Sequence, residues 1–76
     1  MFSYNVNAEA SEKAFKEACE RIEKEIKSIE KEDILVDVDG SKVQIYAATN
    51  GKIKVYNDYE VDAVYIDSEI ELKCFN

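Results

Sequence analysis

The chain has 76 residues, 46% of them hydrophobic and 36% charged, and its formal net charge is −7. This length allows one small domain with a single core layer, because a chain of this size buries only ~60–65% of the surface that it exposes when unfolded. The acidic balance argues against direct binding to nucleic acids or anionic membranes, which repel negative charge over about a Debye length, ~8 Å at physiological salt. Basic proteins are the partners that this charge favours.

Negative charge is concentrated in the second half of the chain. Residues 8–31 carry seven acidic and six basic side chains, whereas residues 32–76 carry ten acidic and four basic ones. We therefore expect the second half to present negative charge to a partner. The alternative is that the net charge only keeps a small domain soluble.

The first third of the chain predicts a strand followed by a long helix. Phe2, Tyr4 and Val6 alternate with polar residues, which is typical of a short strand. Asn7 can cap a helix over residues 8–31. An apolar stripe with i, i+3, i+4 spacing marks the buried face of this helix and comprises Phe15, Ala18, Ile22, Ile26 and Ile29. Glu-to-Lys and Glu-to-Arg pairs at i, i+4 occupy the opposite face, each contributing only ~0.2–0.5 kcal/mol.

From residue 33 onward the apolar period becomes two, which predicts β-strands. Ile34, Val36 and Val38 share one face of the first predicted strand. A two-residue turn at Asp39-Gly40 or at Gly40-Ser41 keeps the next apolar set on that same face. This second set comprises Val43, Ile45 and Ala47.

The turn near residue 50 is predicted from the faces of the two strands that it joins. A three-residue loop over residues 49–51 pairs Ala47 with Ile53 and Ile45 with Val55. It also places a glycine where a left-handed residue is wanted. A two-residue Asn50-Gly51 loop would instead put a lysine in the core, so we expect the longer loop.

The last third of the chain predicts a further hairpin with a turn at Asp67-Ser68. Residues 69–75 alternate and form the expected final strand, with Ile70, Leu72 and Cys74 directed inward. A two-residue turn then directs Val61, Ala63 and Tyr65 inward and leaves Val64 and Ile66 outward. A three-residue turn reverses this assignment.

The order of elements is a strand, a long helix and a four-stranded meander. It predicts an α+β fold over residues 1–76, with the helix packed on an antiparallel sheet of four to five strands. This order resembles the cystatin-like architecture, in which an antiparallel sheet holds one helix. The inhibitory Gln-x-Val-x-Gly signature of cystatins is absent, since Val36-Asp37-Val38-Asp39-Gly40 stands at the first hairpin. The resemblance therefore transfers no protease-binding residue.

Residue types exclude many chemistries. The chain has no histidine, the usual general base near neutral pH, so Ser-His and Cys-His nucleophile pairs are excluded. Two isolated cysteines, Cys19 and Cys74, make no zinc site and are expected to be packed, reduced thiols. An EF-hand alignment on Gly40 fails, because it puts Leu35 and Tyr46 at ligand positions. We expect a non-enzymatic protein without cofactor or metal.

Three acidic rows are the first candidate for a binding surface. Residues two apart on a strand lie ~6.6–6.8 Å apart on one face, close to the phosphate repeat of an extended nucleic-acid strand. Such rows could imitate nucleic acid in the basic groove of another protein. A solvated face with charges that block aggregation is the alternative. The rows are Asp37 and Asp39; Asp58, Glu60 and Asp62; and Asp67, Glu69 and Glu71.

An outward apolar set on the helix-free side of the sheet is the second candidate. Apolar residues rimmed by charge are typical of an interface, and a homodimer through this face is its simplest form. A two-sided core filled by the N-terminal segment, or ordinary cross-strand pairs, are the alternatives. The set comprises Leu35, Tyr46, Tyr56, Val64, Ile66 and Phe75.

Together these features predict a small binding protein that inhibits or sequesters a basic partner, with a nuclease or another nucleic-acid-acting protein as the expected target. Small size, acidity and the absence of catalytic groups are shared by phage-encoded inhibitors as a class. With no signal peptide or membrane-spanning run visible, we expect a cytoplasmic protein. A structural or self-associating domain, including a designed one, is the alternative. The predicted partner-binding residues are Asp37, Asp39, Asp58, Glu60, Asp62, Asp67, Glu69, Glu71, Tyr46 and Tyr56.

Overall fold

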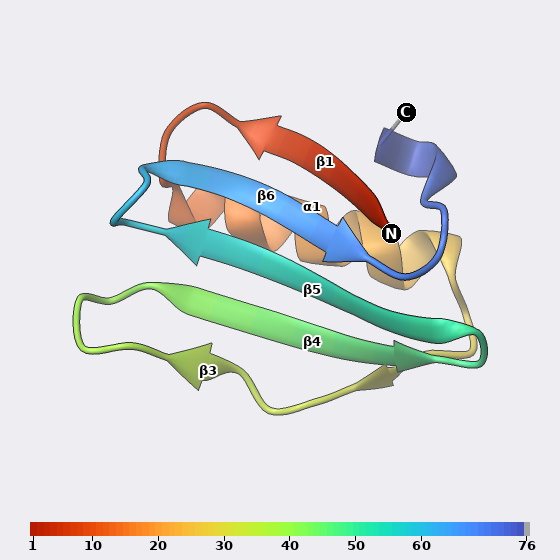
Figure 1. The fold of residues 1–76 in the computed structure, drawn as a ribbon. Coiled ribbons are helices and arrows are strands. Elements are labelled where there is room, and N and C mark those ends of the chain that lie inside the picture. The colour runs from red at the N-terminus through yellow and green to blue at the C-terminus, as the bar shows by residue number, and fades with distance from the viewer. Residues whose placement is uncertain (76) are drawn as a thin grey trace.

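A computed structural model describes residues 1–75 and contains one α-helix packed on one antiparallel sheet. In chain order its elements are β1 (Phe2–Asn7), α1 (Glu12–Glu25), β2 (Glu30–Lys31), β3 (Leu35–Val36), β4 (Lys42–Ala48), β5 (Gly51–Asp58), β6 (Ala63–Ser68) and the short 3-10 helix η1 (Lys73–Phe75) (Figure 1). The architecture is α+β, as predicted. The helix is too short and too polar to cross a membrane, and residues 1–75 contain no helix that could.

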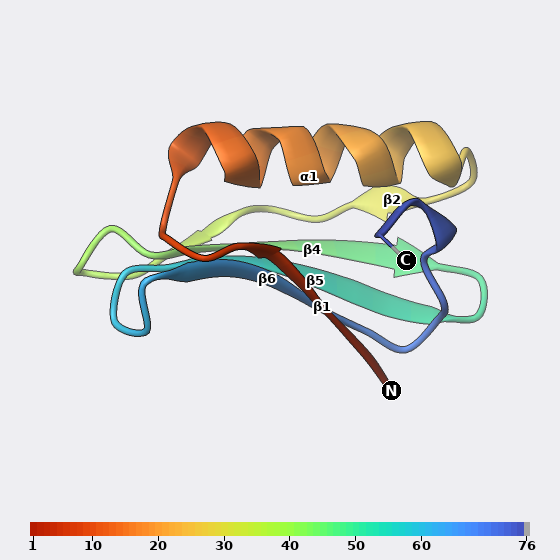
Figure 2. The same cartoon turned by 90° about the horizontal axis from the view of Figure 1, so that it is seen from above.

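The sheet has six strands in the order β1-β6-β5-β4-β2, and β3 also pairs with β4. Helix α1 covers one face of it, and the other face has no helix over it (Figure 2). We call the uncovered side the open face. Strands β3, β4, β5 and β6 pair in chain order as a four-stranded meander, but the sheet has six strands rather than the predicted four to five, because β1 also pairs with β6 and β2 with β4. This strand order does not confirm the cystatin-like topology.

Helix α1 is shorter at both ends than predicted. Ser11, not Asn7, is the N-cap, and its hydroxyl accepts a hydrogen bond from the Ala14 backbone N–H at 3.1 Å. The Asn7 side chain instead donates to the Glu9 carbonyl in the preceding turn. At the other end the helix stops at Ile26, which is extended and leads the chain back to β4. The first part of the predicted stripe is buried and the last two isoleucines pack against the core from outside the helix.

The face assignment predicted for β4 is wrong. The β4–β5 turn contains only Thr49 and Asn50, so Tyr46 pairs with Ile53 and Gln44 with Val55. This one-residue change in the hairpin sends Tyr46 and Gln44 toward the helix and Val43, Ile45 and Ala47 toward the open face.

Gly51 begins β5 rather than closing the turn. Its φ is +154°, and a Cβ built on it would lie 2.7 Å from the Glu69 Cβ. The close approach of the Glu69 side chain, just after β6, together with the positive φ, is therefore what requires a glycine at this position.

The predicted faces of β6 are reversed as well, and residues 69–75 do not form the expected strand. Asp58 pairs with Ala63 across a four-residue turn, which directs Val64 and Ile66 into the core and Tyr65 outward. Strand β6 continues through the predicted Asp67-Ser68 turn. After β6 the chain turns to the helix side of the sheet and forms η1. Leu72, just before η1, is buried, and Cys74, in η1, is half-buried.

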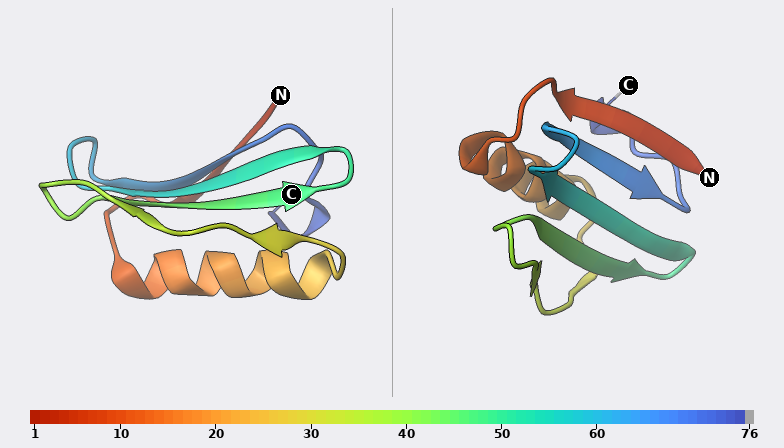
Figure 3. Two further views of the ribbon diagram at one scale, coloured as in Figure 1. Left: turned by 90° about the horizontal axis from the view of Figure 1, so that it is seen from below. Right: turned by 60° about the vertical axis from the view of Figure 1, so that its left-hand side comes forward.

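Residues 34–38 differ most from the prediction. Only Leu35 and Val36 form a strand, and Ile34, Leu35 and Val36 are 42%, 56% and 61% exposed. Val38 is fully exposed. We call residues 34–38 the aliphatic segment. Its alternation predicts an inward face, but the helix does not reach this edge of the sheet, so nothing in residues 1–75 covers it (Figure 3).

The core lies between α1 and the middle of the sheet. Tyr4 connects the two ends of the chain, because its hydroxyl accepts a hydrogen bond from the Leu72 backbone N–H at 2.8 Å. The buried hydrophobic residues are Tyr4, Phe15, Ala18, Cys19, Ile22, Tyr46, Ile53, Val55, Val64, Ile66 and Leu72.

Candidate functional site

Two turns converge at one end of the sheet. The segment between β3 and β4 and the turn between β5 and β6 lie side by side, at the left of Figure 1. They are linked by a hydrogen bond of 2.9 Å from the Tyr59 backbone N–H to the Ser41 hydroxyl. Gly40, with φ of +90°, lies under the Tyr59 ring, where an added Cβ would meet ring atoms at 3.7 Å. We call this region the acidic end.

A cleft of about 400 Å³ lies at the acidic end. Aliphatic and aromatic residues form part of its wall, including Leu35, Val36, Val43 and Tyr56. Four of the predicted partner-binding carboxylates also line it: Asp37, Asp39, Asp58 and Glu60. The wall also contains Lys42, whose Nζ lies 3.0 Å from the Glu12 carboxylate. We call this feature the acidic cleft.

Several of these carboxylates also hold the turns in shape. The Asp39 carboxylate accepts a hydrogen bond from the Ser41 N–H, and that of Asp58 accepts bonds from the Glu60 and Val61 N–H groups. Asp62 accepts a bond from the Ala10 N–H across the domain. The contacts of Asp39 and Asp58 are Asx-type, in which a short acidic side chain bonds to nearby backbone, whereas the Asp62 bond is long-range. The sequence indicated the charges but not this structural role.

The acids of the acidic end do not form strand rows. Asp37 and Asp39 follow β3, Glu60 and Asp62 lie in the turn after β5, and Asp58 is the last residue of β5. The regular spacing expected along a strand is therefore absent. Bonding to the Ser41 N–H lowers the pKa of Asp39 below its usual range, which keeps that carboxylate charged.

The third predicted row lies elsewhere. Asp67 is opposite Lys54 on β5, and its carboxylate accepts a hydrogen bond from the Ser3 hydroxyl. The Glu69 carboxylate accepts a bond of 2.7 Å from the Lys52 N–H. Lys52 and Lys54 line the same small cleft as these two acids. Lys52 is paired with Glu32 at 3.6 Å, so Lys54 is the lysine that offsets the negative charge there. Glu71 is exposed near the β4–β5 turn, away from the acidic end.

The open face carries a stacked tyrosine pair that the sequence did not predict. Tyr56 and Tyr65 are cross-strand partners, with ring centroids 4.7 Å apart and planes inclined by 13°. Burial and a hydrogen bond donated to Asp58 raise the pKa of Tyr65 to about 12. Tyr56 faces outward as predicted. Tyr65 was assigned inward, and only the correct β5–β6 register would have revealed the pair.

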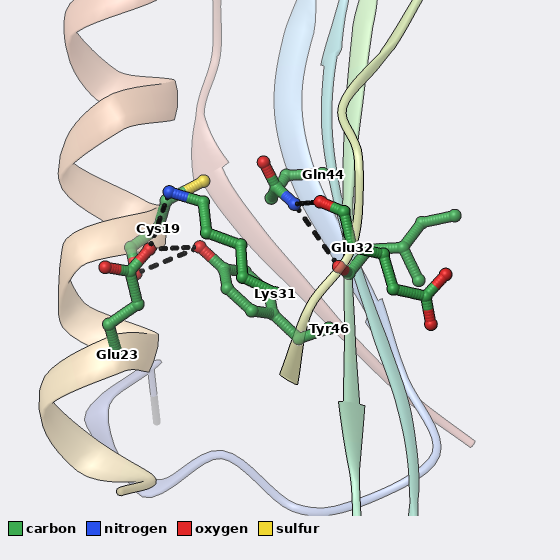
Figure 4. A network of polar contacts seen from close by, with 7 residues as sticks. Cys19, Glu23, Lys31, Glu32, Gln44 and Tyr46 are labelled. Atoms are coloured by element: carbon green, nitrogen blue, oxygen red, sulfur yellow. Dashed lines mark hydrogen bonds and ion pairs between the residues drawn. The ribbon is translucent and has the colours of Figure 1, made fainter. Parts of the chain in front are cut away.

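Tyr46 is not on a surface, contrary to the prediction. Its exposure is 0%, and its hydroxyl donates to the Glu23 carboxylate at 2.6 Å (Figure 4). This bond lowers the pKa of Glu23, and Lys31 supports it from 3.3 Å. Burial, together with the bond to Glu23, raises the pKa of Tyr46 far above its usual range. Val64 and Ile66 of the predicted outward set are also in the core, and Phe75 is partly buried against it.

Within residues 1–75, no group of three or more Cys, Asp or Glu side chains is placed to hold a metal ion. Comparison with models of known protein families, with curated proteins and with solved structures finds no match. The site therefore has to be interpreted from its own geometry.

Proposed function

We propose that this protein binds a basic partner protein through the acidic cleft and the adjoining aliphatic segment, and so inhibits or sequesters it. The observation that carries the proposal is that an apolar surface and an acidic surface adjoin in one cleft. Exposed Leu35 and Val36 lie in the wall of the same cleft as Asp37, Asp39 and Glu60. A partner segment that alternates cationic and aliphatic side chains complements such a surface.

Charge supports a cationic occupant. The lysine in the wall is already paired with Glu12, which leaves the four carboxylates of the cleft with little compensation from within residues 1–75. A lysine or arginine has an aliphatic stem and a charged head. Its stem could pack on Tyr56 and Leu35 while its head lies among the carboxylates.

The aliphatic segment supports a protein partner rather than a small cation. Exposed apolar patches that are rimmed by charge mark interaction surfaces in soluble proteins. A metal ion or a polyamine would leave Ile34 and Val38 in water, whereas an apolar side chain of a partner would cover them. Proteins that act on nucleic acids remain the expected source, because their binding grooves are basic.

The test uses a short peptide that alternates arginine and leucine and carries one tryptophan. The chain has no tryptophan, so the fluorescence of the peptide reports its binding. Asp37→Lys with Glu60→Lys is the informative variant, because it takes one acid from each turn and spares the bonds of Asp58 and Asp62. We expect this double reversal to weaken binding by roughly tenfold or more, with steep salt dependence.

Glu20→Lys with Glu71→Lys is the matched control. It changes the net charge equally at two exposed positions outside the acidic cleft. Equal weakening by both double variants would mean that only net charge is sensed, and the cleft would lose its role. A peptide with glutamate in place of arginine should not bind.

Self-association through the open face is the competing function. The stacked Tyr56 and Tyr65 favour it, because paired aromatic rings commonly lie at interfaces. Tyr65→Glu should then dissociate an oligomer and leave peptide binding unchanged, because Tyr65 does not line the acidic cleft. Loss of peptide binding without dissociation would contradict self-association through this pair.

A further inference from the structure

The two edges of the sheet differ in how well they are protected against further strand pairing. On one side β2 and β3 have two residues each and are separated by three residues, Glu32, Asp33 and Ile34, of which two are acidic. On the other side β1 is a strand of six residues, with no charged residue and no proline (Figure 3). Short, charged, proline-containing or bulged edges hinder strand addition. Strand β1 is not short, charged or proline-containing, and its one irregularity is a register shift against β6 between Asn5 and Asn7.

Backbone groups on the outer side of β1 are available for pairing. Within residues 1–75, strand β1 pairs only with β6. None of the backbone hydrogen bonds formed by turns, loops or caps within residues 1–75 involves residues 2–7. A further strand could therefore continue the sheet outward from β1.

A groove lies beside β1 on the helix side. Its volume is about 390 Å³, and its floor includes Val6, Ala14 and Ala18. Phe2 projects from the same side of β1 at the other end of the strand and is 42% exposed. The edge thus has a groove with both apolar and charged lining near its C-terminal end and an exposed aromatic ring near its N-terminal end.

We propose that a second copy of this chain adds its own β1 antiparallel to β1, which forms one continuous sheet across a two-fold axis. Pairing centred on Tyr4 sets Phe2 of one copy opposite Val6 of the other, where β1 changes its register against β6. Val6 nevertheless packs against the core on the helix side, so the two side chains share a face. Each Phe2 ring then lies beside the groove of the other copy. A two-fold contact requires such self-complementarity.

Charge on α1 also fits a second copy. The rim of the groove carries Glu17 and Glu20 followed by Arg21 and Lys24. The two-fold axis runs the second helix antiparallel, so the acidic end of one rim faces the basic end of the other. The contact strands themselves are neutral, so two chains of net charge −7 can approach there.

This contact is separate from the proposed function. Strand β1 and the acidic cleft lie at opposite edges of the sheet, so a β1 dimer leaves both acidic clefts free. Each copy could then bind one partner.

Sedimentation of the full chain over a concentration series tests the proposal, combined with hydrogen exchange of the amides of residues 2–7. We expect a monomer–dimer equilibrium and protection of β1 amides that rises with concentration. Phe2→Glu should raise the dimer dissociation constant by about tenfold or more. Val61→Glu in the β5–β6 turn is the matched control, because it adds the same charge at an exposed position outside β1 and the acidic cleft, and it should leave the constant unchanged.

Three results would overturn the proposal. The first is a protein that stays monomeric up to about 1 mM, where the affinity would be below ~4 kcal/mol. The second is β1 exchange that is independent of concentration in the parent chain, a readout that holds even if Phe2→Glu fails to fold. The third is a dimer that is dissociated by Tyr56→Glu and not by Phe2→Glu, which assigns the contact to the open face.

Discussion

The aliphatic segment and the middle of β5 have the same sequence pattern and opposite fates. Ile34, Val36 and Val38 alternate with polar or outward residues just as Ile53 and Val55 do. The β5 residues are 0% exposed, whereas Ile34 is 42% exposed and Val38 wholly so. Alternation therefore predicts which residues share a face, but burial depends on whether another layer covers that face. Helix α1 covers β5 and does not reach the edge at β3.

Matched truncations test this contrast most strongly. Ile53→Ala removes a fully buried side chain and should destabilise the protein by ~2–5 kcal/mol, whereas Ile34→Ala should cost less than about 1 kcal/mol. Urea unfolding followed by circular dichroism measures both. If the two costs were equal, the aliphatic segment would have to be part of the core.

Two tyrosines on opposite faces give a second comparison. Tyr46→Phe removes the buried hydroxyl that donates to Glu23, and we expect a loss of about 1 kcal/mol. Tyr65→Phe removes a bond of 3.2 Å to Asp58 on the open face, where water can replace it, so the expected loss is only a few tenths. A larger loss of stability for Tyr65→Phe than for Tyr46→Phe in the same unfolding assay would contradict the expectation that the buried hydroxyl contributes more.

The pH dependence of the Tyr46 contribution follows from its partner. Because the folded state lowers the pKa of Glu23, its carboxylate stabilises the fold above the unfolded pKa near ~4.3. That contribution is lost as the pH falls through the lower folded pKa. The stability difference between the parent and Tyr46→Phe should accordingly be constant near neutral pH and shrink in acid. A difference that grows in acid would contradict the assignment.

The two thiols give the smallest expected contrast. Cys19 lies on the buried face of α1, and burial raises the pKa of its thiol. Burial and a bond to Glu25 raise the pKa of Cys74 to about 11 on η1. Both should react slowly with a thiol reagent in the native state and rapidly in denaturant, with half-buried Cys74 several-fold the faster. If Cys19 were labelled faster than Cys74 in the native state, its position on the buried face of α1 would be contradicted.

Parts of the fold could be predicted because local patterns decide them. The stripe around Phe15 and Ile22 identified the buried face of α1, and the alternation around Tyr4 identified β1. The faces of β4 and β6 could not be assigned in this way, since one residue more or less in a turn inverts a whole strand. Tyr46 illustrates the difficulty: it looks amphipathic in sequence, and only the position of Glu23 makes its burial favourable.

The candidate site was predicted in its charges and missed in its geometry. Acidic residues near Gly40 and Asp58 were identified from their positions in the sequence. Their convergence could not be, because it depends on β4 and β5 bringing two turns to one end of the sheet. The exposure of Val36 and Val38 was missed for the same reason, since a local pattern carries no information about the reach of the helix.

The central claim is that the acidic cleft and the aliphatic segment form one recognition surface. Backbone amide shifts of the labelled protein, recorded while the arginine–leucine peptide is added, test it most directly. We predict that the largest shifts fall in residues 34–43 and 56–60 and that Asp37→Lys with Glu60→Lys abolishes them. Shifts confined to other acidic positions such as Glu69 and Glu71, or spread evenly over the exposed carboxylates of α1, would contradict the claim.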